Sequence, residues 1–135
     1  ACLSAIEANL AAAQGRDDCA VMVDALSEAL AELKHTTETL LASMVERDID
    51  LALANSAVYL EFFGHVVVGW MWLKQGLVAA TELASEPHAD DEAFYRGKLQ
   101  AMNYFARWEL PHTRTWGELL RNLDDTPYAM QASWF

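Results

Sequence analysis

One Glu-x-x-His motif in this sequence, Glu109 to His112, has the spacing of a metal-binding motif. Di-iron sites in helical bundles take such a motif from each of two helices, together with one further glutamate from each of two others. Pro111 interrupts the helix that would present this motif. We therefore predict no metal site and no metal-dependent oxidase activity.

A second pair of groups that could move protons is Glu61 with His65, four residues apart and hence neighbours on a helix. General acid–base catalysis also needs a nucleophile and a group that orients the base, and the sequence around this pair shows neither. We interpret the pair as a polar patch on an apolar helix, and we predict no catalytic residue in this chain.

Three glycines, Gly64, Gly69 and Gly76, lie in the same segment but do not form a nucleotide-binding pattern after a strand. Each costs a helix about 1 kcal/mol relative to alanine, so we expect them to permit a close contact between helices or domains. An apolar ligand groove is the alternative.

The charge of the chain excludes several classes of partner. It holds 20 acidic and 9 basic residues, a formal net charge of −11. Nucleic acids and anionic membrane surfaces attract lysine and arginine, so this chain is unsuited to them, and also to polyanions such as nucleotides or coenzyme A. We predict no cofactor bound by this chain itself.

Two cysteines, Cys2 and Cys19, have no metal-ligand spacing and are too few for a disulfide framework. A bridge between the first two helices stays open, although reduced thiols in a cytoplasmic protein are favoured. Residues 1–14 do not resemble a secretory signal peptide. The chain opens with alanine and not methionine, which indicates processing or a piece of a longer protein.

The elements that position these groups are organised around residues 55–75, in the second half of a long helix. One of its faces is formed by Ala52, Asn55, Tyr59, Phe62, Val66, Gly69, Leu73 and Gly76. A helix that is apolar nearly all round is enclosed by neighbours or by a partner chain. Its uninterrupted apolar run, residues 66–73, is shorter than the roughly 20 residues of a membrane span, so we predict no span.

Two helices should precede this central one. Residues 3–14 predict a short helix stopped by Gly15, and Asp17 or Asp18 would cap the next. That second helix carries a bundle seam of Val23, Leu26, Leu30, Leu33, Thr37, Leu40 and Met44. We expect a turn at residues 47–50, with Asp48 or Asp50 capping the central helix, which should end near Ser85.

A further helix should follow, with Asp90 as its cap. Its apolar face would hold Phe94, Gly97, Ala101, Tyr104, Phe105 and Trp108, opposite a wet side of Glu92, Arg96, Gln100, Asn103 and Arg107. Pro111 either kinks this helix or starts a new one that ends near Asn122. Residues 123–135 have no helical period and finish on two aromatics, which we expect to be docked on something.

The fold class expected from this order is all-α. Residues 1–135 would form a single antiparallel four-helix bundle-like domain with a short leading helix and an irregular C-terminal tail.

Three runs of the chain resemble a known family: NSAVYLEFFGHVVVGWMWLKQ (55–75), DEAFYRGKLQAMNYFARWELP (91–111) and LDDTPYAMQASWF (123–135). The sequence is similar to the helical C-terminal domain of bacterial acyl-CoA dehydrogenases, the acetyl-CoA dehydrogenase-like C-terminal domain found in the 3-methylmercaptopropionyl-CoA dehydrogenase group. The likeness covers residues 48–135, and the first two helices match only in pattern.

The resemblance implies that this chain is the C-terminal portion of an FAD-dependent, homo-oligomeric enzyme of fatty acid metabolism that oxidises an acyl-CoA to the 2,3-enoyl-CoA. In that family a glutamate removes the α-proton and the flavin accepts the β-hydride. Flavin, coenzyme A and that glutamate belong to preceding domains, so no catalytic or cofactor-binding residue is carried onto this chain.

The expected role is therefore architectural: the domain would cover an apolar surface of its own catalytic domains and contribute to subunit assembly. The residues predicted at that contact are Phe62, Val68, Trp72, Trp134 and Phe135. The alternative is a free-standing helical bundle that binds an apolar small molecule or a partner helix.

Overall fold

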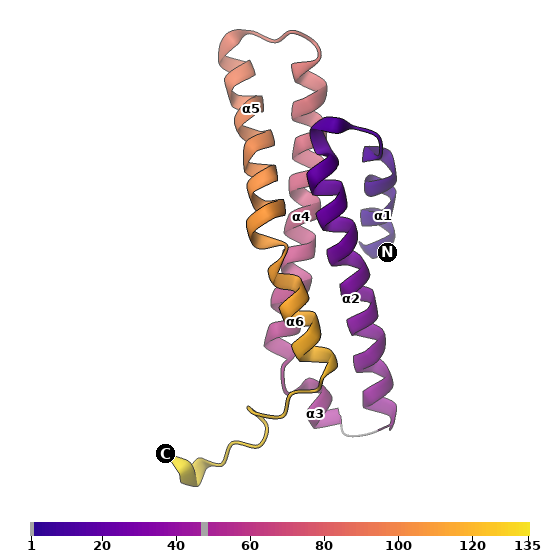
Figure 1. Ribbon diagram of the computed structural model, residues 1–135, viewed down its shortest axis with the longest axis vertical. Helices are drawn as coiled ribbons and strands as arrows, with labels where there is room; N and C mark the ends of the chain where they lie inside the picture. Colours follow the sequence, from indigo (N-terminus) through magenta and orange to yellow (C-terminus); the bar gives the residue numbers. More distant parts are fainter. Residues whose placement is uncertain (1, 47–48) are drawn as a thin grey trace.

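The structure is a computed structural model that describes residues 2–46 and 49–135. Its helices are α1 (Cys2–Ala13), α2 (Ala20–Glu46), α3 (Ile49–Leu53), α4 (Ser56–Leu83), α5 (Ala89–Tyr104) and α6 (His112–Arg121). No strand occurs in those residues. They form an elongated bundle in which α5 and α6 follow one another along α4, α2 lies beside them, and the short α1 flanks α2 (Figure 1). The predicted all-α, bundle-like fold is confirmed.

The link from α1 to α2 turns at Gly15, whose φ of +79° suits glycine, as expected of the stop. A 3₁₀ turn, Asp17–Cys19, then precedes α2. The residue before this turn, Arg16, makes no side-chain capping hydrogen bond. Asp17 and Asp18 therefore do not cap α2 as predicted. Asp18 instead accepts a hydrogen bond from the Arg16 side chain at 3.3 Å, because the extra turn displaces it from the start of the helix.

The predicted seam of α2 faces the core. Five of its members are buried and two are half-buried; the buried ones are Val23, Leu26, Leu30, Leu33 and Leu40. Thr36, beside the seam, is also fully buried, and its hydroxyl accepts a hydrogen bond from Arg121 of α6 at 2.9 Å. The seam thus packs α2 against the rest of the bundle while one polar contact ties it to α6.

The start of the central helix differs from the prediction. Asp48 lies outside the described residues, and Asp50 belongs to the first turn of α3, a separate short helix. The capping residue of α4 is Asn55, whose side chain makes no capping hydrogen bond. Asn55 donates its side-chain amide to the carbonyl of Asp124 at 2.8 Å, so this position anchors the C-terminal segment to the bundle.

The helical row that contains Phe62, Val66, Gly69, Leu73 and Gly76 is the side of α4 that is buried. This face packs against α1, α2, α5 and α6. The close packing expected of the glycines holds at two of them. A Cβ at Gly69 would lie 3.2 Å from Leu110, and one at Gly76 would lie 2.2 Å from the sulfur of Met102, whereas at Gly64 nothing lies within 4 Å.

The outer face of α4 is apolar too. By length and composition α4 would be long enough to cross a membrane: its most apolar window has a mean hydropathy of 1.2, and only 22% of that window is buried. The core helix of a helical domain meets the same criteria, so the predicted absence of a membrane span stays a prediction. What the structure establishes is that one side of α4 closes the core while Leu60, Val68 and Val78 remain exposed.

The turn into α5 follows from Pro87. Helix α4 ends at Leu83, close to the expected Ser85, and Glu86 has a positive φ of 55° directly before the proline. His88 is the capping residue of α5 and its ring nitrogen accepts a hydrogen bond from the backbone of Asp90. Asp90 is therefore not the cap, but it lies in the first turn, where its charge still favours the helix.

The predicted apolar face of α5 is wrong for most of its residues, although Phe105 is half-buried and packs against the core. Its buried residue is Met102, followed by Ala106 in the next turn, whereas Phe94, Tyr104 and Trp108 are exposed. The contact with α4 explains the choice. Gly76 leaves a groove that the slender Met102 side chain fills, so the bulky aromatics stay outside.

Pro111 starts a new helix, one of the two outcomes expected of it. It is the capping position of α6, which ends at Arg121, one residue before the expected Asn122. The preceding turn, Phe105–Glu109, is π-helical, with the amide of Leu110 bonded to the carbonyl of Phe105. A proline supplies no amide hydrogen, so the chain widens by one residue per turn there.

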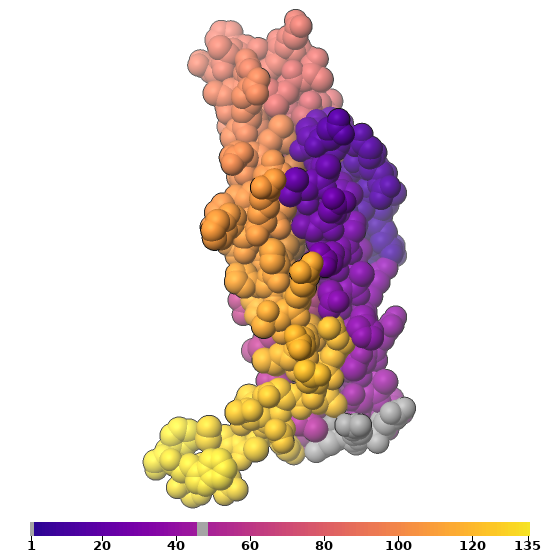
Figure 2. Space-filling view, in the orientation of Figure 1, coloured from indigo at the N-terminus to yellow at the C-terminus, as the bar shows by residue number. Residues whose placement is uncertain are grey.

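Beyond α6 the described chain is irregular apart from a 3₁₀ turn at Ala132–Trp134. This C-terminal tail leaves the lower end of the bundle and stands clear of it (Figures 1 and 2). Trp134 is 63% exposed and Phe135 is 95% exposed. The terminal aromatics are therefore not docked on this chain.

The close approach at Gly76 generates a stability prediction. Gly76→Ala should lower the free energy of unfolding by about 1–3 kcal/mol, because the new methyl group overlaps the buried Met102 side chain. Gly64→Ala, on the same helix with open space around it, should raise that free energy by about 0.5–1 kcal/mol. Urea unfolding followed by the helical circular dichroism signal compares the two, and equal stabilities would show that the groove is not tightly packed.

Candidate interface surface

The Glu-x-x-His motif does not converge on a site. Glu109 lies 3.8 Å from the Nε2 of His65 on α4, while the ring of His112 stacks on Trp116 at a centroid distance of 5.8 Å. Within the described parts of the chain, no group of three or more His, Cys, Asp or Glu side chains is arranged to hold a metal ion.

In the second candidate pair for proton transfer, Glu61 and His65, the histidine makes contacts that join helices. His65 Nδ1 lies 3.0 Å from the backbone carbonyl of Glu61, one helical turn earlier. The edge of its ring contacts Trp116 at a centroid distance of 4.7 Å, and Phe105 lies 6.0 Å away. With its other nitrogen facing Glu109, this histidine links α4 to the π-helical turn and to α6.

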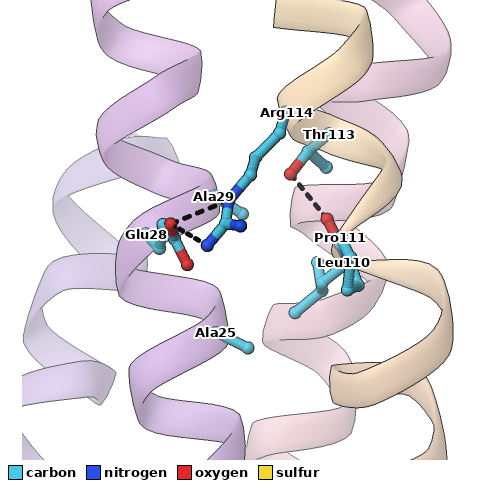
Figure 3. A pocket seen from close by; sticks show the side chains of 7 residues that line it. All are labelled: Ala25, Glu28, Ala29, Leu110, Pro111, Thr113 and Arg114. Carbon is cyan, nitrogen blue, oxygen red and sulfur yellow. Dashed lines mark hydrogen bonds and ion pairs between the residues drawn. The ribbon is translucent and has the colours of Figure 1, made fainter.

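A small hollow lies between α2 and α6, with a volume of about 70 Å³ (Figure 3). Arg114 crosses it and binds Glu28, and the Thr113 hydroxyl donates to the carbonyl of Leu110 at 2.6 Å. Pockets that enclose drug-sized ligands have volumes of about 300–1,000 Å³. The hollow is too small for such a ligand, and the arginine and glutamate that line it serve to join two helices.

A second ion pair joins the same helices further along. Arg121 binds Glu32 at 2.6 Å, with both side chains partly buried, and also reaches Thr36. Gly117 makes room, since a Cβ there would lie 2.9 Å from the Arg121 guanidinium. Neither acid was given a role from the sequence. Glu28 and Glu32 are four residues apart on α2, and Arg114 and Arg121 are seven residues apart on α6, so each pair shares one face of its helix. These two rows of opposite charge are the signal that would have revealed the pairing.

Apart from the C-terminal tail, the exposed aromatic groups lie along α5, the turn after it and the adjoining edge of α4. We call this surface the α4–α5 face and define it by Val68, Trp72, Phe94, Tyr104 and Trp108. The rings of Tyr104 and Trp108 stack on each other at 5.9 Å. The ammonium of Lys98 lies over two more rings, 5.6 Å from Trp72 and 5.4 Å from Phe94, and so bridges the two helices.

The residues predicted at the interface fall into three groups. Phe62 is 0% exposed and belongs to the chain's own core, so its assignment to an outer contact is wrong: the helix turns it inward with Val66. Val68 is exposed and Trp72 is half-buried on the α4–α5 face. Trp134 and Phe135 lie exposed on the tail, which is a separate surface.

Two aromatics of α5 and one of the π-helical turn after it were misplaced. Phe94, Tyr104 and Trp108 were expected on the apolar face because their spacing puts them on one side of a helix. The competing row on the same helix, Leu99 with Met102 and Ala106, was the usable signal, since its smaller side chains match the glycines of α4.

Both cysteines are free thiols in this structure, Cys2 exposed and Cys19 buried. Burial, with a smaller contribution from Asp18, raises the pKa of the Cys19 thiol to about 11. A disulfide between the two, which the sequence left open, is not formed here.

Comparison with known proteins assigns the bundle to a described domain type. The sequence profile of the family described as "Acetyl-CoA dehydrogenase C-terminal like" matches residues 2–131. The chain belongs to this family. The match includes α1 and α2, which the three resembling runs did not cover, so the whole bundle is the acyl-CoA dehydrogenase C-terminal domain.

A curated relative agrees with this assignment. Over 71 residues, 53% of the chain, the domain is 30% identical to the broad-specificity linear acyl-CoA dehydrogenase FadE5 of Mycobacterium tuberculosis (strain ATCC 25618 / H37Rv). The aligned part is 12% of that protein's length. The acyl-CoA dehydrogenase C-terminal domain described here thus corresponds to a small part of that relative.

The raised pKa of Cys19 predicts a pH dependence of stability. Its pKa in the folded chain, about 11, exceeds the ordinary value of 9.0, so the thiol favours the folded state below pH 9 and that contribution is lost as the pH rises toward 11. Cys19→Ala should therefore lose less stability than the wild type over this interval. Urea unfolding at pH 9 and at pH 11 measures the loss in the free energy of unfolding. Cys2→Ala is the matched control. Identical losses in Cys19→Ala and wild type would contradict the effect of Cys19.

Proposed function

We propose that this domain is the C-terminal architectural and assembly domain of an FAD-dependent acyl-CoA dehydrogenase, without catalytic activity of its own. The parent enzyme would oxidise an acyl-CoA to the 2,3-enoyl-CoA, as a cytoplasmic homo-oligomer. The single observation that carries the proposal is the α4–α5 face, an aromatic surface left open by a bundle whose core is otherwise closed.

Exposed aromatics on this scale favour a covering partner. Burying a side chain the size of phenylalanine is worth about 1.5–3 kcal/mol, and the face presents Phe94, Tyr104 and Trp108 from one helix. Soluble monomers rarely leave contiguous apolar patches larger than a few hundred Å² uncovered, and larger ones mark interaction sites. The partner we propose for the α4–α5 face is the catalytic part of the same enzyme.

We expect this domain to bind neither flavin nor coenzyme A itself. Both carry phosphates, which require free cationic groups or an open helix N-terminus. Several of the few cationic side chains here are already engaged by acids: Arg16, Lys34, Arg96, Arg114 and Arg121. Under this proposal the FAD and the acyl-CoA are bound by other parts of the enzyme.

The curated relative supports a division of this kind. It is named as an acyl-CoA dehydrogenase, and the aligned region accounts for 12% of its length, so most of that protein lies outside the match. So small a share of the length is consistent with a domain that supplies contacts while the catalytic groups lie elsewhere in the protein. The homo-oligomer and the cytoplasmic location are expectations carried by this proposal alone.

The proposal predicts the effect of removing the contact in the full-length enzyme. Val68→Ser combined with Trp108→Ser should weaken attachment of the domain by about 1–3 kcal/mol, which is about 5-fold to 150-fold in affinity. Both side chains are exposed in the isolated domain, so its own fold should not change. Trp72→Ser added to this pair should increase the effect. The measurements are the flavin retained through gel filtration and the oligomeric mass.

The matched control is Leu60→Ser, which changes an exposed leucine of α4 that belongs neither to the α4–α5 face as defined nor to the apolar hollow at the other end of the bundle. It should retain flavin like the wild type. Full flavin retention and unchanged assembly in the Val68 and Trp108 variant would refute the architectural role.

A further inference from the structure

The C-terminal tail presents apolar side chains that this chain does not cover. Met130, Trp134 and Phe135 are all at least half exposed, and the last residue almost completely so. A tryptophan or phenylalanine buries roughly 150–250 Å² when it is covered, so leaving both in water is costly. The tail stands away from the bundle in the direction of open solvent (Figure 2).

A receiving surface lies at the same end of the bundle. We call it the end groove, an apolar hollow of about 190 Å³ between α2, α3, α4 and the last turn of α6. It is lined by Thr37, Leu40, Leu41, Met44, Ala52, Leu53, Ser56, Tyr59 and Leu120. Its rim is apolar as well, because the exposed Leu41 and Val45 follow one another on α2, and Ile49 lies one turn before Leu53 on α3.

The volume of the end groove limits the size of the group that can bind in it. Pockets that enclose drug-sized ligands have volumes of about 300–1,000 Å³. A hollow of about 190 Å³ is smaller than that and suits one or two anchoring side chains. Tryptophan is the residue most typical of such anchors in protein interfaces.

The tail begins at the edge of this groove and leads away from it. Its root is held where the Asn55 amide donates to the carbonyl of Asp124 at 2.8 Å, two residues from the groove wall at Leu53. Leu123 has a positive φ of 50°, and the amide of Ala129 then bonds the carbonyl of Asp125 at 2.8 Å. These local bonds direct the chain outward, so its end is presented to another molecule and not to its own groove.

We propose that Trp134 and Phe135 of one copy bind in the end groove of a second copy, giving a two-fold pair with exchanged tails. The proposal rests on the assembly role proposed above and names the partner of one of its surfaces. A reciprocal exchange closes at two copies, because each copy donates one tail and receives one.

The area involved is enough for such a pair. Two tails with two exposed aromatics and a methionine each, together with the surfaces that they cover, would bury on the order of 1,500 Å². Stable protein–protein interfaces bury about 1,200–2,000 Å² in total. The exchange therefore reaches the size of a stable interface without contributions from the α4–α5 face.

The test uses the 135-residue chain, whose core is closed by its own residues. Its mass is measured by sedimentation over a range of concentrations at high salt, which screens the repulsion between two copies of charge −11. The tail variant is W134S/F135S. The groove variant is L41K/L53K, which alters two exposed leucines, and the helical circular dichroism signal confirms that each variant is folded.

The wild type should form a pair, and each variant alone should be at least about tenfold weaker in self-association. An equimolar mixture of the two variants should form a mixed pair, since one intact tail then meets one intact groove. The matched control is F94S, an equally exposed aromatic on the α4–α5 face, and it should pair like the wild type.

Three results would overturn the exchange: a monomeric wild type, a pair that survives W134S/F135S, or no mixed pair from the two variants. Loss of pairing in F94S would assign the contact to the α4–α5 face instead. An apolar small molecule that copurifies with a monomeric wild type, and is lost in L41K/L53K, would assign the groove to a ligand. None of these outcomes depends on flavin retention through Val68 and Trp108, so failure here and failure of the proposed function are separable.

Discussion

The contact between Gly76 of α4 and Met102 of α5 fixes the orientation on which the outer surface of this domain depends. The sulfur of Met102 lies where a Cβ would otherwise be, so the two helices approach closely only with this residue inward. With Met102 turned inward, Phe94, Tyr104 and Trp108 remain exposed. The exposed aromatic face is therefore a direct consequence of the way the core is closed.

Two ion pairs fix the position of α6 beside α2. Arg114 and Arg121 of α6 bind Glu28 and Glu32 of α2, and Gly117 gives the second pair its room. Partly exposed ion pairs contribute little to stability on average, so their value here is in fixing the register of α6 beside α2. That register places Leu120 in the wall of the end groove and directs the tail away from the bundle.

The sequence predicts the elements whose pattern is strong and local. The seam of α2, the stop at Gly15 and the break at Pro111 all follow from helical periodicity and backbone chemistry. Which face of α5 is buried could not be predicted this way, because two apolar rows compete and the choice depends on a glycine groove in another helix. Phe62 was placed outside for the opposite reason: a helix that is apolar all round does not show which side is covered.

The central claim is that the α4–α5 face is open in this domain and covered in the complete enzyme. Hydroxyl-radical footprinting of the 135-residue chain and of the full-length enzyme measures side-chain accessibility directly. We expect Phe94, Tyr104 and Trp108 to be labelled in the isolated domain and protected in the enzyme, with the buried Phe62 protected in both. Equal labelling of the three aromatics in both forms would contradict the account.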